Sequence, residues 1–221
     1  MSDLGVFTLV IVFSFSLWWL YKQHHRQVIQ SRANLLNGFA KVMTVSETHF
    51  NTAGYASLKG VFNQTPLSLR VEVDNLTARK IPVMWLHIQL PNTPAINGSL
   101  DILVRPQNTE FYSPSWQWSQ PIKPLSGWPE HARYMSRDLA PELQAIDADV
   151  RTIFADQKVK ELLITPDAVR LTYLIRQADR GNYLLLRSVQ FDDEPIDSDQ
   201  VAALTRQLQR LQQNLTGGKN T

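Results

Sequence analysis

Five histidines are the side chains in this sequence best suited to metal binding or acid–base chemistry. His24 and His25 are adjacent, so on a helix their rings point about 100° apart and hold one ion poorly. His87 falls in a predicted strand, while His49 and His131 lie in less regular sequence. Because no pair has the spacing of a helical or strand metal site, we expect no metal ion and no cofactor.

A run of carboxylates from Asp192 to Glu194 is the other candidate for an ion site. A divalent-ion site needs further oxygen ligands from elsewhere in the chain. Acidic residues ahead of a helix, by contrast, stabilise the helix N-terminus without any ion. We therefore interpret this run as a solvated loop.

Few sequence signals favour an enzyme. The chain has no cysteine, which excludes disulfides, thiolate metal sites and a cysteine nucleophile. Glycine-rich phosphate loops and the GxSxG and HExxH motifs are absent as well. A hydrolase or transferase acting on a substrate near a membrane is therefore the weakest functional interpretation.

An uncharged stretch of eighteen residues, from Leu4 to Tyr21, dominates the chain. As a helix it would span about 27 Å, close to the ~30 Å hydrocarbon core of a bilayer. It ends in Trp and Tyr, which prefer the headgroup layer, and it lacks the basic start and small-residue cleavage site of a signal peptide. We predict an uncleaved transmembrane anchor. Its representative residues are Leu4, Phe7, Ile11, Phe15, Trp18, Trp19 and Tyr21.

The residues that follow the stretch predict its orientation. Lys22, Arg26, Arg32 and Lys41 precede the next acidic residue, Glu47. The positive-inside rule then places the C-terminal part in the cytoplasm, with these cations near anionic headgroups. We predict a single-pass protein of the cytoplasmic (inner) membrane. The alternative is the opposite topology, in which a periplasmic or extracellular module binds an envelope ligand.

Length and charge limit the rest of the chain. The remaining 200 or so residues suit one domain with its own core. Net charge is +2 with scattered Lys and Arg, which indicates no nucleic-acid partner. We divide the chain into an anchor (1–21), a basic juxtamembrane stalk helix (22–46) and one soluble domain (47–221).

Alternating apolar residues predict an α+β domain. Residues 44–55 look like a linker, and short connections between the strands indicate antiparallel meanders. We expect a mostly antiparallel sheet of about six or seven strands, covered by two helices. The predicted strands are 55–62, 67–73, 83–90 and 100–104, then 161–165, 169–175 and 183–191. The predicted helices are 141–156 and 198–215.

Residues 106–129 hold five prolines and three tryptophans, which forbids a helix interior or a central strand. Trp116, Trp118 and Trp128 could bind an extended peptide from a partner. The competing interpretation is an aromatic cluster that seals one end of the sheet. A long loop of this kind either packs on the domain or binds something.

The last predicted helix has an apolar seam with alternating three- and four-residue steps. Its members are Val201, Leu204, Leu208, Leu211 and Leu215. The seam spans barely two heptads, so packing on the sheet or stalk is favoured over a homodimer. With little site chemistry in the domain, we expect a non-enzymatic accessory or scaffolding protein that holds a protein partner at the membrane.

Overall fold

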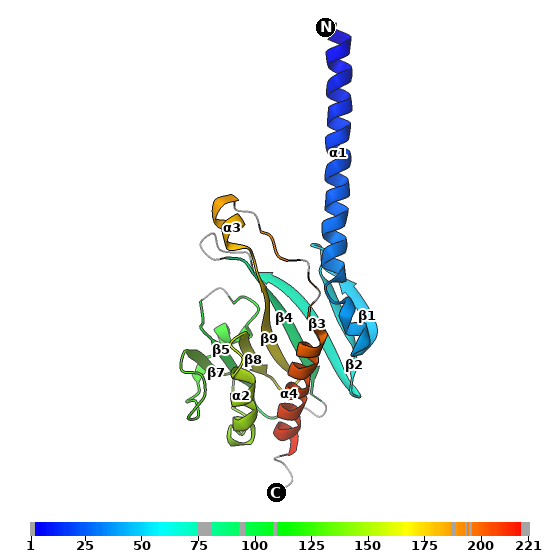
Figure 1. Cartoon of the computed structure of the whole chain (residues 1–221). Helices are drawn as coiled ribbons and strands as arrows, with labels where there is room; N and C mark the ends of the chain where they lie inside the picture. Colours follow the sequence, from blue (N-terminus) through cyan, green and yellow to red (C-terminus); the bar gives the residue numbers. More distant parts are fainter. Residues whose placement is uncertain are drawn as a thin grey trace.

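A computed structural model describes residues 3–74, 81–92, 96–107, 110–186, 189–192, 194 and 196–217. One long helix rises from an α+β domain whose helices lie on one face of a sheet (Figure 1). The predicted fold class is therefore confirmed.

The helix α1 (Asp3–Asn34) stands clear of the domain over its apolar part. Within the described residues it is the one helix long and apolar enough to cross a membrane, and none of its most apolar window is buried. At 1.5 Å per residue it is about 48 Å long, more than the ~30 Å a bilayer core requires. The surplus lies at its C-terminal end, where α1 meets the domain.

The expected helix over 22–46 is shorter in the structure. α1 ends at Asn34, and a 3-10 helix, η1 (Asn37–Lys41), follows. Leu36 and Phe39 are only 1% exposed, because the chain turns here and inserts them into the core of the domain. The first strand then begins at Thr44, in residues that the sequence suggested were a linker.

Nine strands form one sheet within the described residues, more than the six or seven expected. They are β1 (Thr44–Phe50), β2 (Ala56–Phe62), β3 (Thr65–Asp74), β4 (Val83–Pro91), β5 (Leu100–Val104), β6 (Gln120–Pro121), β7 (Ala132–Ser136), β8 (Val159–Ile164) and β9 (Ala168–Gln177). Their order is β1-β2-β3-β4-β9-β8-β5-β7-β6, and neighbouring strands are antiparallel. The late hairpin β8–β9 thus lies between β4 and β5, so the first meander is not continuous.

The predicted strand over 183–191 is wrong. Residues Arg180–Leu186 form a short helix, α3, which begins after Asp179 accepts a hydrogen bond from the Asn182 backbone N–H at 2.6 Å. The leucine run suits a helix as well as a strand, since Leu is among the better helix formers. Its side chains are exposed rather than buried on both faces.

Two helices cover one face of the sheet, as predicted. They are α2 (Asp147–Phe154), which follows the 3-10 helix η3 (Gln144–Ile146), and α4 (Ser198–Gly217) (Figure 1). Asp197 precedes α4 and caps it, because its carboxylate accepts the backbone N–H groups of Asp199 and Gln200 at 2.9 and 3.2 Å. The apolar residues of β4, such as Leu86 and Ile88, face these helices and form the core.

Candidate functional site

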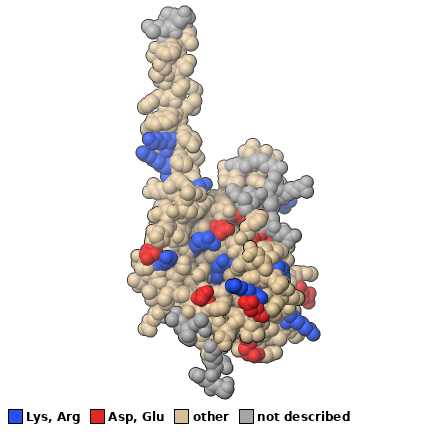
Figure 2. Space-filling view, turned by 180° about the vertical axis from the view of Figure 1, so that it is seen from behind, with Lys and Arg blue, Asp and Glu red and all other residues tan. Residues whose placement is uncertain are grey.

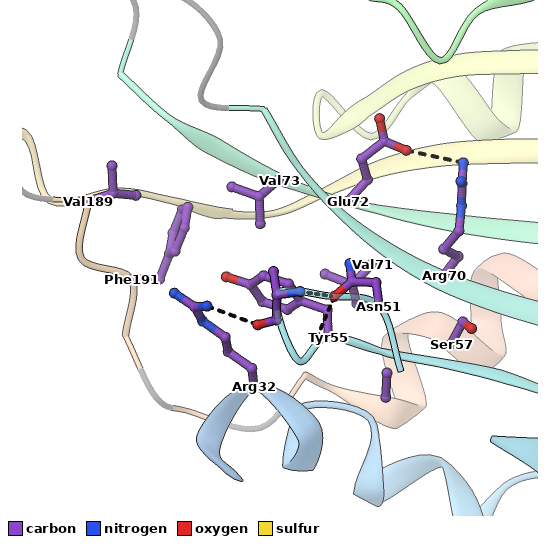
Figure 3. A pocket seen from close by; sticks show the side chains of 12 residues that line it. Arg32, Asn51, Tyr55, Ser57, Arg70, Val71, Glu72, Val73, Val189 and Phe191 are labelled. Atoms are coloured by element: carbon purple, nitrogen blue, oxygen red, sulfur yellow. Dashed lines mark hydrogen bonds and ion pairs between the residues drawn. The ribbon is translucent and has the colours of Figure 1, made fainter. Parts of the chain in front are cut away.

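A groove lies where α1 joins the domain, and we call it the junction groove. It consists of two hollows of about 550 and 690 Å³ that share four lining residues, Arg32, Tyr55, Val189 and Phe191. One hollow extends over the ends of β2 and β3 (Figure 3). The other extends along α1 toward the apolar stretch and includes Tyr21.

The wall formed by α1 is fixed to the turn between β1 and β2. Arg32 donates to the Ala53 carbonyl oxygen at 2.9 Å, and its guanidinium lies 5.1 Å from the centre of the Tyr55 ring. Asn51 closes the turn by accepting the backbone N–H groups of Ala53 and Tyr55 at 3.0 and 2.9 Å (Figure 3). Gly54 has a φ of +86°, and a Cβ there would lie 2.8 Å from Ile29, so this residue must stay small.

The opposite wall is the segment 189–192, which an ion pair holds in place. Arg176 at the end of β9 is almost fully buried, and its Nε lies 2.9 Å from Asp192 Oδ1. Glu72 and Arg70 on β3 pair at 3.1 Å near the first hollow (Figure 3). Burial raises the pKa of Tyr55, so its hydroxyl is protonated at neutral pH. The groove therefore combines apolar, aromatic and oppositely charged side chains.

A second polar constellation lies on the face of the sheet opposite the helices, and we call it the far-face network. His87 Nδ1 lies 3.1 Å from Thr172 Oγ1, and the Thr172 hydroxyl donates to Glu161 Oε2 at 2.9 Å. Arg170 donates to the same Glu161 oxygen at 2.8 Å. His87 Nε2 lies 3.3 Å from Glu72 Oε2, so the far-face network extends to the junction groove.

The segment after β5 covers this network. The Ser115 hydroxyl donates to Asp101 Oδ2, and Lys160 pairs with Glu110 at 2.8 Å. Burial and the Glu161 carboxylate raise the pKa of Asp101 well above its usual range. Burial also lowers the pKa of His87, against the opposing effect of Glu72. These groups are sealed inside the domain and attach the covering segment to the sheet.

Comparison with known proteins identifies no family. No family model matches the sequence, and no curated protein matches it. One solved structure, described as the crystal structure of the mycobacterial trehalose monomycolate transport factor A, TtfA, is similar at a TM-score of 0.46. Sequence identity is 9%, over 86% of this chain and 95% of that chain. A likeness this weak supports no conclusion about function.

The three tryptophans do not form one surface. Trp128 is 5% exposed, and its Nε1 donates to Asp147 Oδ1 at 2.7 Å, so it packs beneath α2. Trp116 is 36% exposed, with the Arg133 guanidinium 4.3 Å from its ring centre. Trp118 is half-buried. Trp116 and Trp118 are thus the two that a partner can reach.

The seam of α4 lies against the sheet. Val201, Leu204, Leu208 and Leu211 are each at most 3% exposed and belong to the core, and Leu215 is half-buried against it. A second copy of the chain can therefore contact little of this seam.

The basic residues after the apolar stretch divide into two groups. Lys22 lies 4.8 Å from the centre of the Trp18 ring, and Arg26 is exposed on α1. Figure 2 shows basic side chains gathered on α1 between its apolar part and the domain. Arg32, by contrast, contacts the domain roughly 17 Å further along the helix than Tyr21, and Lys41 lies beyond the end of α1. Of the four cations, Lys22 and Arg26 are the two that directly follow the apolar part of α1 and are exposed.

The histidines and the acidic run are dispersed among the described residues. No group of three or more His, Asp or Glu side chains there could hold a metal ion. His24 and His25 line the groove, and His49 pairs with Glu47 at 3.1 Å on the exposed strand β1. Asp192 forms an ion pair with Arg176, and Asp193 is outside the described residues.

Sequence reasoning missed the junction groove. Its lining residues come from α1, the β1–β2 turn, β2, β3, β4, β9 and the segment after α3, and no local pattern links them. The far-face network had a partial signal, because strand alternation puts His87 on the face opposite Leu86 and Ile88. Nothing in the sequence indicated that Thr172 and Glu161 would lie beside it.

Proposed function

We propose that this chain is a single-pass, membrane-anchored accessory protein, without enzymatic activity, that holds a protein partner at the cytoplasmic face of the membrane. The observation that carries the proposal is the exposure of α1. Its large apolar side chains from Val6 to Tyr21 are between 46% and 69% exposed. An apolar surface of this extent is unfavourable in water and is removed from water by a bilayer.

The junction groove is our candidate site for the partner. Its lining offers apolar contacts from Val71 and Val73, an aromatic face from Tyr55, and hydrogen-bonding groups from Ser57 and Glu72 (Figure 3). Such mixed chemistry suits a polypeptide segment, which presents backbone amides and side chains of several kinds. A segment bound there would be held directly beneath the bilayer, next to Tyr21.

Trp116 and Trp118 form a second candidate surface. An accessible tryptophan stacked on an arginine resembles the aromatic anchors found at the centres of protein interfaces. This surface lies on the segment that covers the far-face network, so a partner there would contact that segment, on the side of the domain opposite α2 and α4.

The test is chemical crosslinking in intact membranes, followed by purification of the tagged full-length chain. Ser57→Trp fills the groove, and we expect the yield of crosslinked partner to fall about tenfold, the effect of a 1.4 kcal/mol loss of affinity. Thr152→Trp, on the exposed side of α2, is the matched control and should leave the yield unchanged.

The double variant Trp116→Ala, Trp118→Ala tests the second surface in the same assay. A loss in this variant alone would place the partner there and not in the groove. Identical recovery of proteins with all three variants would contradict the scaffolding proposal.

A further inference from the structure

The short helix α3 ends in an exposed apolar cluster. Leu184, Leu185 and Leu186 are 54%, 84% and 72% exposed, and Val189 after them is 40% exposed. We call these four residues the leucine tip. Adjacent large apolar residues at this exposure are unusual on the surface of a domain, and they mark a binding surface for a partner molecule or a membrane.

The leucine tip is presented on a braced projection. Tyr183 is buried, and its backbone N–H donates to the Asp179 carbonyl at 3.0 Å. The Asp179 N–H donates to the Gln190 carbonyl at 2.9 Å, and the Asn182 side-chain amide donates to Gln190 Oε1 at 2.9 Å. These contacts close the base of the projection while leaving the leucines outside.

The projection points the same way as α1. Figure 1 shows α3 at the end of the sheet from which α1 rises. Val189 in the tip and Gln190 after it line the same hollow as Tyr21 and His24, so this part of the projection lies across a groove from the C-terminal end of the apolar stretch. Tyr21 and the Trp18–Lys22 pair mark the headgroup level, because aromatic rings and basic residues gather there.

We infer that the leucine tip is a second membrane contact, which inserts into the headgroup and upper acyl layer of the leaflet that α1 enters. The surface that the leucine tip contacts is lipid, because the tip lies near the headgroup level that Trp18, Tyr21 and Lys22 mark on α1. The inference rests on the proposal that α1 spans the bilayer. Its consequence is that the domain is held at two points, so the junction groove faces the membrane at a fixed angle.

The test uses the absence of native cysteine. Leu185→Cys is labelled with an environment-sensitive fluorophore, and the full chain is reconstituted in vesicles of phosphatidylethanolamine and phosphatidylglycerol. We expect blue-shifted emission, quenching by a lipid with a shallow nitroxide, and protection from aqueous iodide. Phe15→Cys, within the apolar stretch, and Arg206→Cys, on the exposed side of α4, are the membrane and water references.

The references separate the two proposals. If the label at Phe15 reports lipid while that at Leu185 reports water, the leucine tip does not insert and the anchor stands. That result would instead favour a protein partner as the molecule that contacts the leucine tip. If the label at Phe15 also reports water, the membrane anchor itself fails.

A substitution series adds a second readout. With the label at Arg180→Cys, the triple change Leu184→Gln, Leu185→Gln, Leu186→Gln should abolish quenching by the shallow nitroxide lipid, because the apolar side chains that hold α3 at the interface are gone. These positions are exposed, so the domain should stay folded. Unchanged quenching at Arg180 would overturn the inference.

Discussion

Asp101 is the carboxyl in the far-face network whose environment least favours its charge. It is fully buried, its Oδ2 accepts from Ser115 and Ser113, and its Oδ1 has no hydrogen-bond partner. Burial and the Glu161 carboxylate raise the pKa of Asp101. The folded chain therefore keeps a proton that the unfolded chain releases near pH 4.

This gives a prediction for the pH dependence of stability. At pH values between the unfolded and the folded pKa of Asp101, the folded state holds a proton that the unfolded state has released. The stability that this proton contributes is therefore complete below the unfolded pKa. It is lost as pH rises, by up to about 1.4 kcal/mol per pH unit. Asp101→Asn cannot titrate, so its free energy of unfolding should rise relative to the wild type between pH 5 and pH 8.

The measurement is urea denaturation of the full chain in detergent, followed by tryptophan fluorescence. Asp138→Asn is the control, because the Asp138 side chain is 85% exposed and should give no pH-dependent difference. Parallel pH profiles for Asp101→Asn and the wild type would show that Asp101 is ionised in the folded state.

At the scale of elements, β1 depends on one glycine in its neighbour. Gly60 in β2 pairs with Val45, and a Cβ at Gly60 would collide with the Thr44 carbonyl oxygen and lie 2.7 Å from Met43 Cε. The backbone of β1 passes over this position, so only a residue without a side chain fits. A side chain at residue 60 would therefore force the backbone of β1 to move.

Gly60→Ala should displace β1 and lower the free energy of unfolding by about 1–3 kcal/mol, the usual cost of overpacking. Hydrogen exchange in Thr44–Phe50 should become faster, while exchange in β4 should change little. Gly217→Ala is the matched control, because a Cβ at Gly217 meets no atom within 4 Å. Unaltered protection of β1 in Gly60→Ala would show that the β1–β2 pair accommodates a Cβ at residue 60 without losing its hydrogen bonds.

The elements also show how far local sequence reasoning extends. Alternation correctly placed β3, β4, β5 and β9, because each has one face in the core. It failed at α3, where three consecutive leucines have no period and the fold exposes them. It also failed on the strand order, because β8–β9 enters between β4 and β5 through pairings between residues distant in sequence.

The candidate sites followed the same rule. The sequence identified the apolar stretch, since its signal is local and continuous. It grouped Trp116, Trp118 and Trp128 by proximity in the chain, but the structure separates Trp128 from the other two. The junction groove depends on residues as far apart as Arg32 and Phe191, which only the folded chain brings together.

At the scale of the whole molecule, the proposed topology rests on the charges beside α1. Lys22 and Arg26 follow its apolar part directly, and a phosphatase that is active only after export should therefore be inactive when fused after Thr221. Replacing Lys22 and Arg26 with Ser, and Ser2 and Asp3 with Lys, reverses the charge difference between the two ends of the apolar stretch and should activate the reporter. Activity of the unaltered fusion would instead support the envelope-binding alternative.

The order of the strands also sets when the domain can be completed during synthesis. β4 has no partner on one side until β9 leaves the ribosome, and β9 ends at Gln177 whereas β4 ends at Pro91. At about 5–20 residues per second this interval lasts roughly 4–17 s. α1 has emerged long before, so a chain delivered co-translationally to a bilayer would close its sheet while already tethered there. The nascent β4 edge would then be exposed beside the lipid rather than in free solution.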